Sequence, residues 1–496
     1  MDTDRSSSAL LPATPELRAK AQVRTLPEWL TPMRALAAVE DAPHTILFES
    51  AGAPGASSEW TLLAFDPPWR LEVAEGALWE VRGERRARRP GAPLEALAAA
   101  WPCRAEIEDA PSVPFLSGLA GAIAYDFKDW IERYPDRARR ERPTPDLSLG
   151  FYDCVWAWSR ATGEGWCVST GLAENDPGRR ERRAGEVLEA QWSRVTAGGV
   201  ADGSGLGSVV RAGAIRSNFT RDAYCRMVEV ALEHIAAGDI YQVNLSQRFL
   251  ADSAPRPATL YRSLREAAPA PFMAYLSLEE GGVASSSPER FFRVRGRHIE
   301  TWPIKGTRPR GATPEEDTAL RLELIHSDKD RAENVMIVDL ERNDLGRVCA
   351  IGSVAVPTLC EVASHSNVHH FESRVVGTLR EDAAPVDVLR ALFPGGSITG
   401  TPKIRSVQII DRLEPVRRGI YTGALGYWDV RGDGDWNIAI RTIVAGGGTA
   451  SFHVGGGIVA DSTPEGEYEE TLVKASGMMR ALGVRAPSPS TSSPRA

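Results

Sequence analysis

The chain has 496 residues, of which 43% are hydrophobic and 25% are charged, and its formal net charge at pH 7 is −8. This composition is typical of a soluble globular protein with a sizeable core, and the length allows more than one domain. The acidic balance excludes a general electrostatic attraction to nucleic acid or anionic membranes, so an anionic ligand must be held by a local cluster of lysines and arginines.

The N-terminal part of the chain is predicted to be rich in strands. Residues 1–20 are expected to form a loose arm, followed by a domain at 21–196 whose short apolar runs end at turn residues. A charged segment within it, at 178–195, has helical spacing. The glycine-rich residues 197–217 are expected to be a linker to a second domain.

The second domain is expected at 218–484, and residues 485–496, rich in proline and serine, are expected to be a disordered tail. Helical spacing appears at 221–237, 327–344 and 465–482, with strand-like runs between these segments. Because strands outnumber helices and do not alternate with them regularly, we predict an α+β fold, rich in sheet, with helices packed outside.

The cysteines and the first residues indicate the cellular compartment in which the protein is expected. Six cysteines are scattered along the chain without a C-x-x-C pair, which fits a reducing environment and argues against a disulfide-stapled secreted fold. The N-terminal segment lacks a basic stretch followed by an apolar core, and no apolar run is long enough to span a bilayer. A cytoplasmic location is expected.

Residues 301–311 contain the strongest candidate for a reactive side chain. Lys305 lies between a Pro-Ile pair and a glycine, and Arg308 and Arg310 follow. In a tight, partly apolar turn a lysine loses hydration, which lowers its pKa and makes its amine a nucleophile near neutral pH. The alternative is a surface loop whose three cations face water.

Carboxylates on two predicted helices are candidate metal ligands. Ser462, with Glu465 three residues later, offers a helix start, and the helix then places Glu467, Glu470 and Lys474 on one face. Glu333 lies on the earlier helix at 327–344. Mg²⁺ takes one or two carboxylates together with water and an anionic substrate, so Glu333 and the later helix can share it. The alternative is ordinary ion pairing, such as Glu470 with Lys474 on a solvated helix face.

The histidines and the other glycine runs support neither a zinc site nor a nucleotide-binding site. His365 and His369 have a spacing that suits zinc on a helix, but their surroundings are strand-like and no further ligands complete a set. His370 is the better functional candidate, as a polar side chain next to an active site. The glycine runs match neither of the common nucleotide-binding patterns.

Six segments, in this order, resemble the chorismate-utilising enzymes. They are GDIYQVNLS (238–246), SPERF (287–291), PIKGTRPRG (303–311), DRAEN through RNDLG (330–346), GGSITG (395–400) and GGGIVADS (455–462). An ordered set of six motifs is far more specific than any one of them. The family includes anthranilate synthase component I, aminodeoxychorismate synthase component I, isochorismate synthase and salicylate synthase. The N-terminal part resembles that of the two amine-transferring members.

The resemblance implies a role for each matching residue. Glu333 and Glu470 would hold Mg²⁺, which binds the ring carboxylate of chorismate. Glu289 would be the general acid that protonates the departing C4 hydroxyl, and a carboxyl in that role must be kept protonated by its surroundings. Gln242 and His370 complete the expected catalytic residues. The expected substrate contacts are Thr399, Gly396, Tyr421, Arg441, Gly457, Lys474 and Glu467.

Two positions distinguish the branches of the family. Gln242 stands where isochorismate synthases carry a lysine base, so this chain is not expected to activate water. Lys305 stands where anthranilate synthases have alanine, and it resembles the lysine of aminodeoxychorismate synthase component I. That lysine is thought to attack C2 as the C4 hydroxyl leaves, after which ammonia adds at C4 and expels it. The expected product is 4-amino-4-deoxychorismate, a precursor of 4-aminobenzoate and folate.

The resemblance also implies a partner and a second ligand site. We find no glutaminase nucleophile motif in the chain, so a separate glutaminase is expected to supply ammonia. A partial match to the tryptophan site of anthranilate synthases involves Glu49, Ser50, Pro271, Phe272 and Met273. Two alternatives stay open: anthranilate synthase component I, and a catalytically silent regulator that binds chorismate or tryptophan.

Overall fold

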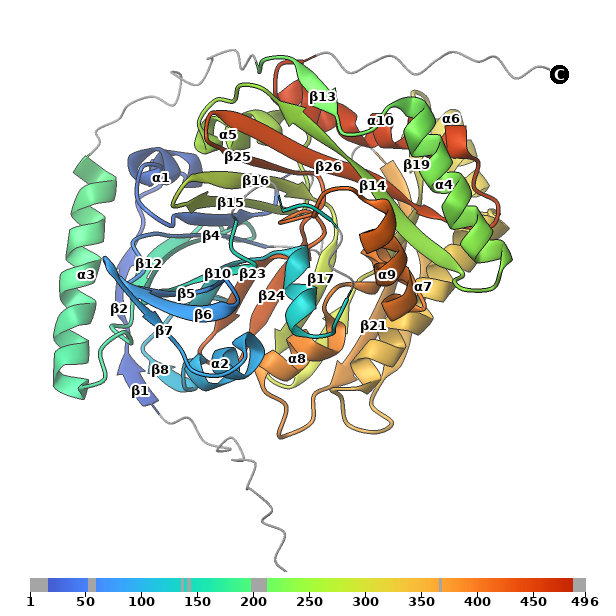
Figure 1. Cartoon of the computed structure of the whole chain (residues 1–496). Coiled ribbons are helices and arrows are strands. Elements are labelled where there is room, and N and C mark those ends of the chain that lie inside the picture. Colours follow the sequence, from blue (N-terminus) through green and yellow to red (C-terminus); the bar gives the residue numbers. More distant parts are fainter. Residues whose placement is uncertain are drawn as a thin grey trace, which may run out of the picture.

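The computed structural model describes residues 17–51, 59–134, 138–140, 144–197, 212–364 and 368–484. These residues form two large sheets with helices packed outside them (Figure 1). Each sheet has twelve strands, and the paired strands within both sheets run antiparallel. The predicted α+β class is confirmed.

The first sheet contains the strand that carries Lys305. In order across the sheet its strands are β19 (Ile304–Pro309), β21 (Val368–Thr378), β18 (His298–Thr301), β17 (Arg290–Arg295), β24 (Gly434–Ile438), β23 (Ala424–Asp429), β9 (Gly118–Ile123), β10 (Leu147–Tyr152), β5 (Trp69–Ala74), β6 (Ala77–Arg82) and β7 (Arg85–Arg88). A further strand, β20 (Ala355–Ser364), pairs with β21.

The second sheet contains the glycine-rich motif at 455–457. In order its strands are β13 (Ile215–Ser217), β14 (Gln242–Ala251), β26 (Thr449–Ile458), β25 (Thr442–Gly446), β16 (Gly281–Ser287), β15 (Phe272–Leu278), β3 (Ile46–Glu49), β4 (Trp60–Ala64), β11 (Cys154–Ser159), β12 (Gly165–Ser169) and β2 (Gln22–Thr25). The short β22 (Gly400–Thr401) pairs with β14.

Strands from both sides of the predicted linker build each sheet. In the first sheet β9 pairs with β23, and in the second sheet β3 pairs with β15. The linker falls mostly on residues outside the described ranges, so the domain boundary stays a prediction. Two of its details need correction. Leu17–Lys20, expected in the arm, forms β1 and pairs in parallel with β8 (Ala105–Glu108), and Ile215–Ser217, expected in the linker, forms β13. The predicted tail at 485–496 also lies outside the described residues.

The four segments with predicted helical spacing correspond to α3, α4, α7 and α10 of the described chain, and the other helices were not predicted. The helix bounds are α1 (Pro32–Val39), α2 (Pro93–Ala100), α3 (Pro177–Ala197), α4 (Arg221–Ala236), α5 (Pro257–Ala267), α6 (Pro314–Ile325), α7 (Asp328–Gly346), α8 (Pro385–Leu392), α9 (Lys403–Leu413) and α10 (Pro464–Ala481), with short 3₁₀ helices at Tyr125–Trp130 and Gly396–Ile398. In Figure 1, α3 lies at the opposite end of the molecule from α7. None of these helices has the length and hydropathy needed to cross a bilayer.

The core is divided into apolar layers on the two faces of each sheet. Between the sheets pack small and medium side chains such as Ala122, Leu276 and Leu425. On the outer faces, α5 buries Leu260 against the second sheet and α8 buries Leu389 against the first. Each large apolar side chain buried in this way contributes roughly 1.5–3 kcal/mol, so the sheets form a stable support for the polar residues at their ends.

Candidate active site

The segment that carries Lys305 is a strand and not the tight turn that the sequence predicted. β19 pairs with β21, with Lys305 opposite Phe371, and the register shifts at Gly306. Gly306 has a φ of 64°, and a Cβ there would lie 2.9 Å from the Cβ of Asp330, so a glycine is required. This bulge at a sheet edge determines where the lysine side chain points.

The alternative in which all three cations face water is also wrong. Arg308 bonds to Glu323 Oε1 (2.7 Å) and to Asp330 Oδ2 (3.1 Å). Arg310 makes a bidentate contact with the carboxylate of Asp317, with hydrogen bonds of 2.6 and 2.8 Å. Both arginines therefore fasten β19 to α6 and α7, and Lys305 is left as the cation that faces the candidate site.

Lys305 lies in a desolvated position among opposite charges. Its Nζ donates to the carbonyl oxygen of Ser397 over 3.4 Å. Burial lowers the pKa of Lys305, although the carboxylates of Glu333 and Glu289 act in the opposite direction. A lowered pKa increases the fraction of neutral amine, which is the nucleophilic form.

Glu289 is a buried carboxyl close to the same point. Burial raises the pKa of Glu289, whereas the Ser397 hydroxyl and the ammonium groups of Lys305 and Lys474 favour its charged form. A raised pKa keeps a carboxylic acid protonated, as general acid catalysis requires. Lys305, on β19, and Glu289, in the connection that precedes β17, therefore approach one position, with Ser397 next to both.

Two carboxylates of α10 share the space above a glycine. A Cβ at Gly456 would lie 2.7 Å from Glu467 Oε2 and 3.6 Å from Glu470 Oε1. The helix is capped by Thr463 and not by Ser462 as the sequence suggested. The Ser462 hydroxyl instead donates to Glu467 Oε1 (2.6 Å), which fixes this side chain and leaves its buried Oε2 without a hydrogen-bond partner in the described chain.

These carboxylates fit a magnesium ion. Burial raises the pKa of Glu333, Lys305 and Lys329 act in the opposite direction, and Asp330 and Glu470 add smaller rises. In the described ranges, no three His, Cys, Asp or Glu side chains lie close enough together to hold a metal by themselves. Mg²⁺ typically uses one or two carboxylates and completes its shell with water and an anionic substrate, so this donor set suits it.

Lys474 has the partner that ordinary helix pairing predicts. Its Nζ lies 2.6 Å from Glu470 Oε1 and 3.0 Å from the Gly455 carbonyl oxygen. Although burial acts in the other direction, the Lys474 ammonium lowers the pKa of Glu470, which keeps that carboxylate charged at neutral pH. A charged carboxylate is the form that a metal ion binds.

The strands β14 and β26 contribute a polar wall. Gln242 is fully buried, its Nε2 donates to Asn244 Oδ1 (3.0 Å), and its Oε1 has no partner in the described chain. Gly457 pairs with Asn244, and a Cβ at Gly457 would lie 2.5 Å from Gln242 Nε2. A buried acceptor without a partner, next to backbone kept bare by glycine, is well suited to a polar ligand.

The loop at 395–399 closes another side of the site. Thr399 is fully buried and its hydroxyl donates to the Gly395 carbonyl oxygen (2.9 Å). A Cβ at Gly396 would lie 2.7 Å from Leu340 Cδ2 on α7, so the glycine lets the helix approach. Asn244 Nδ2 donates to the Ser397 carbonyl oxygen (2.7 Å), which links this loop to β14.

A buried ion pair that sequence analysis missed holds these parts together. Arg418 donates to both oxygens of Glu414, at 2.7 and 2.9 Å, and each residue is 4% exposed. Arg418 also donates to the carbonyl oxygens of Asn244 (2.7 Å) and Ile398 (3.1 Å). The signal in the sequence was weak, because an Arg-Arg pair beside a proline and a glycine is typical of a solvated loop.

Three predicted residues lie in places that the described contacts do not join to Lys305. Tyr421 stacks on the ring of His453, with centroids 5.1 Å apart. Arg441 has a φ of 49° and is exposed, although desolvation by the surrounding atoms lowers its pKa. His370 lies opposite Thr307, and its Nε2 is 3.0 Å from Glu372 Oε1. The roles assigned to them stay predictions.

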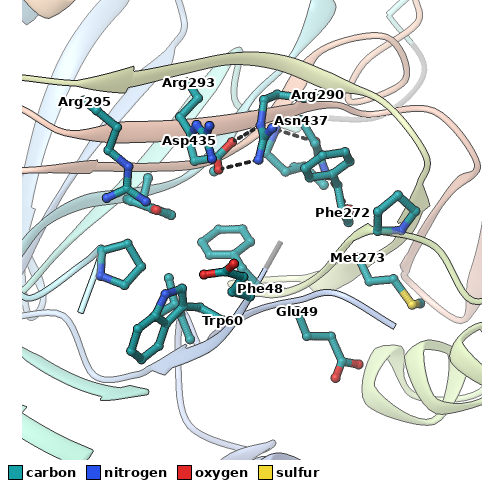
Figure 2. Close-up of a pocket in the computed structure, with 17 residues that line it drawn as sticks. Phe48, Glu49, Trp60, Phe272, Met273, Arg290, Arg293, Arg295, Asp435 and Asn437 are labelled. Atoms are coloured by element: carbon teal, nitrogen blue, oxygen red, sulfur yellow. Dashed lines mark hydrogen bonds and ion pairs between the residues drawn. The ribbon is translucent and has the colours of Figure 1, made fainter. Parts of the chain in front are cut away.

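Four of the five residues proposed for tryptophan line a cavity of about 310 Å³ (Figure 2). Glu49, Pro271, Phe272 and Met273 line it, with Glu49 opposite Met273 in the β3–β15 pair. Ser50 is not among its lining residues. The Glu49 carboxylate already accepts bonds from Tyr261 (2.6 Å) and Arg265 (2.6 Å), so it holds helix α5 as well as the cavity wall.

Comparison with known proteins agrees with this geometry. Aminodeoxychorismate synthase component 1 of Bacillus subtilis is 38% identical over 440 residues, covering 88% of this chain and 92% of that protein. Anthranilate synthase component 1 of Bacillus caldotenax is 36% identical over 448 residues, covering 88% of each. The crystal structure of anthranilate synthase component I from Streptococcus pneumoniae aligns with a TM-score of 0.75 at 29% identity, covering 86% of this chain and 93% of that one.

The match to the family model is equally broad. Residues 44–480, which include every candidate catalytic and metal-binding residue described above, match the model for chorismate binding enzymes. The chain therefore belongs to the chorismate binding enzyme family.

Proposed function

We propose that the chain converts chorismate and ammonia to 4-amino-4-deoxychorismate, as the component I of an aminodeoxychorismate synthase. The observation that carries the proposal is Lys305: a desolvated amine with a lowered pKa, facing the buried acid Glu289. Relatives with two different activities in their names match at 38% and 36% identity, so the choice between products rests on this lysine.

The reaction divides into two halves. First, the neutral Lys305 amine forms a bond to C2 of chorismate, the two ring double bonds shift, and the C4–O bond breaks. The departing hydroxyl takes the proton of Glu289 and leaves as water. Ammonia then adds at C4, the double bonds return, and the lysine leaves C2 as its neutral amine. The ammonium group formed at C4 gives one proton to the Glu289 carboxylate, which restores the acid.

Carboxylates and cations share the work of holding the dianionic substrate. Glu333 and Glu470 would hold Mg²⁺, which would supply positive charge to the ring carboxylate, and Glu467 would contact the substrate. Arg441, Tyr421 and Lys474 would hold the other polar groups of the substrate. The bare backbone at Gly396 and Gly457 leaves room for these contacts, and Thr399 and Gln242 form the polar wall.

In the proposed function, a partner subunit and not this chain supplies the ammonia. The designation of the relatives as component 1 supports a partner subunit, which we propose to be a glutaminase in the same cytoplasmic compartment. A free ammonium salt should replace the partner in vitro. The product is proposed to serve 4-aminobenzoate and folate synthesis.

Product identity tests the proposal. The protein is mixed with chorismate, Mg²⁺ and an ammonium salt, and the products are separated by chromatography and identified by mass. We expect aminodeoxychorismate, and we expect Lys305→Ala to reduce its formation on the order of 100-fold or more. Anthranilate with pyruvate as the product would refute the proposal in favour of anthranilate synthase component I. Binding of chorismate without turnover would favour a silent regulator.

The tryptophan site is a second proposal, supported by the cavity of Figure 2. Its wall carries Arg290, Arg293 and Arg295 together with acidic residues, and its volume of about 310 Å³ is of the size that holds a small molecule. This mixture of charges beside aromatic side chains suits a zwitterionic aromatic amino acid. Isothermal titration with tryptophan tests it, and an absence of heat at millimolar tryptophan would refute it.

A further inference from the structure

An asparagine on β14 connects several parts of the candidate active site. The Nδ2 of Asn244 donates to the Ser397 carbonyl oxygen (2.7 Å), and its Oδ1 accepts from Gln242 Nε2 (3.0 Å). The main-chain amide of Asn244 donates to the carbonyl oxygen of Thr399 (2.9 Å). One residue thus holds the loop at 395–399 at two points and Gln242 at a third, although sequence analysis assigned it no role.

The carbonyl oxygen of Ser397 is shared by Asn244 and Lys305. It accepts from Asn244 Nδ2 over 2.7 Å and from Lys305 Nζ over 3.4 Å. A carbonyl oxygen has two lone pairs, so it can accept from both nitrogens at once. The shorter bond fixes the oxygen, and a neutral amine that donates one N–H to a fixed oxygen keeps its lone pair free to form a new bond. The Asn244 amide therefore helps to determine where the Lys305 amine lies.

The same contact fixes the orientation of two side-chain amides. A carbonyl oxygen can only accept, so Asn244 must turn its nitrogen toward Ser397 and its oxygen toward Gln242. The Asn244 oxygen also only accepts, so Gln242 must present its Nε2 to it. The Gln242 Oε1 is then left as a fully buried acceptor without a partner in the described chain. A ligand group that reaches this atom must be a donor.

Neighbouring atoms restrict Asn244 at its side chain and at its main chain. Gly457 lies opposite Asn244 in the β14–β26 pair, and a Cβ at Gly457 would lie 2.9 Å from Asn244 Oδ1. The glycine thus leaves room for the amide but no room for a larger neighbour. Arg418, held by Glu414, donates to the main-chain carbonyl oxygen of Asn244 (2.7 Å). The asparagine is therefore held in place before any ligand binds, as a preorganised site requires.

We propose that Asn244 is a positioning residue that holds the Ser397 carbonyl oxygen, and through it the Lys305 amine, in the place from which the amine attacks the substrate. Asn244 itself exchanges no proton and forms no bond to the substrate. Its second hydrogen bond keeps the Gln242 amide in one orientation. The inference rests on the proposed function, because it takes Lys305 as the nucleophile.

Two substitutions of Asn244 test the proposal in assays with chorismate, Mg²⁺ and an ammonium salt. Asn244→Leu is similar in size and removes both side-chain hydrogen bonds, whereas Asn244→Asp keeps the acceptor for Gln242 and removes the donor to Ser397. We expect kcat to fall about 10–100-fold in both variants, with the KM for chorismate within about threefold of wild type. Misplacing a reacting group slows the chemical step without weakening substrate binding.

A matched control separates this effect from the substitution itself. The Oδ1 of Asn218 accepts from the main-chain amide of Arg248 (2.7 Å), and a carboxylate can accept the same bond. Asn218→Asp should therefore leave kcat and KM unchanged. Should Asn244→Leu fail to fold, the nearly isosteric Asn244→Asp carries the test. A wild-type kcat in either folded variant of Asn244, or a loss confined to KM, would overturn the proposal.

A measurement without turnover keeps this inference distinct from the proposed function. Acetic anhydride is added at neutral pH in the absence of chorismate, and acetylation of Lys305 is followed by mass spectrometry of its peptide. A carboxylate at position 244 would lie beside the oxygen that Lys305 Nζ contacts, and it would favour the unreactive ammonium form. We expect acetylation to be about tenfold slower in Asn244→Asp, and within about threefold of wild type in Asn244→Leu and Asn218→Asp.

The two possible failures have different signatures. Equal acetylation of Lys305 in Asn244→Asp and in the wild-type protein would show that residue 244 does not act on this amine, and would overturn the proposal. Formation of anthranilate by the wild-type protein would instead refute the proposed function, and the acetylation rates would still report on the contact between Asn244 and the site of Lys305.

Discussion

The buried pair of Arg418 and Glu414 allows the support of the site to be measured directly. The substitution Arg418→Met removes five hydrogen bonds, two of them to Glu414, and leaves a carboxylate that is 4% exposed without its cation. Removing one partner of a buried ion pair typically costs 3–5 kcal/mol, because the remaining charge is desolvated and unpaired. We expect a loss of about that size in the free energy of unfolding.

A second substitution shows whether the unpaired charge is the cause. Glu414 Oε1 also accepts bonds from the Ser246 amide (2.8 Å) and the Ser246 hydroxyl (2.9 Å), so replacing Glu414 by an apolar residue would leave a buried amide without a partner. Glutamine keeps an acceptor oxygen and carries no charge. Arg418→Met/Glu414→Gln should therefore be more stable than Arg418→Met by about 1–2 kcal/mol.

The assay is urea unfolding followed by tryptophan fluorescence and by circular dichroism, with agreement of the two signals as the condition for using a free energy. A cost below about 1 kcal/mol for Arg418→Met would refute the reasoning, since a surface pair costs no more than that. No recovery in the double variant would show that the lost hydrogen bonds, and not the charge, determine the cost.

The remaining predictions concern metal, pH and stability. Gly456→Ala should raise the Mg²⁺ concentration for half-maximal activity by about 10–100-fold, because the new Cβ would displace a carboxylate. Gly185→Ala, where a Cβ meets no atom within 4 Å, should leave this concentration unchanged. Equal Mg²⁺ dependence of the two variants would contradict the prediction. Product formation should fall at low pH as Lys305 gains a proton and at high pH as Glu289 loses one, and a flat profile from pH 5 to 10 would exclude these roles. Burial raises the pKa of Glu341, on α7, from its ordinary value of 4.5 to about 8, so unfolding releases its proton between these pH values and stability falls as pH rises. The gain in melting temperature of Glu341→Gln over wild type should therefore grow from pH 5 to pH 8, and a constant difference would refute this.

Local motifs identified candidate residues that the structure brings close together, but they did not predict the conformation of the chain around them. Glu333, Lys305 and Glu289 were identified because each lies in a short segment with a distinctive order of residues. The conformation around Lys305 was predicted as a turn, because the strand that pairs with it, β21, begins about 60 residues later, and sequence patterns carry no sign of such a distant partner.

The buried arginine that supports the site could not be predicted from the sequence, for a related reason. Arg418 lies in a run of charged residues that is typical of a solvated loop. Its burial depends on contacts such as its hydrogen bond to the carbonyl oxygen of Asn244, which lies far away in the sequence. The pairing of β9 with β23 and of β3 with β15 could not be predicted either, since it joins segments on opposite sides of the expected linker.

N-terminal and C-terminal strands pair at two places, β9 with β23 and β3 with β15, and these pairs determine what happens when the chain is cut. A protease cut within 198–211 would sever the chain without breaking either sheet, because β9 and β23, and likewise β3 and β15, would stay paired. The two fragments should remain together as one active particle. Either fragment produced alone would expose the long unpaired edges of two sheets, which invites aggregation. Coexpression of 1–197 with 212–496 should thus rescue two pieces that are each insoluble by themselves.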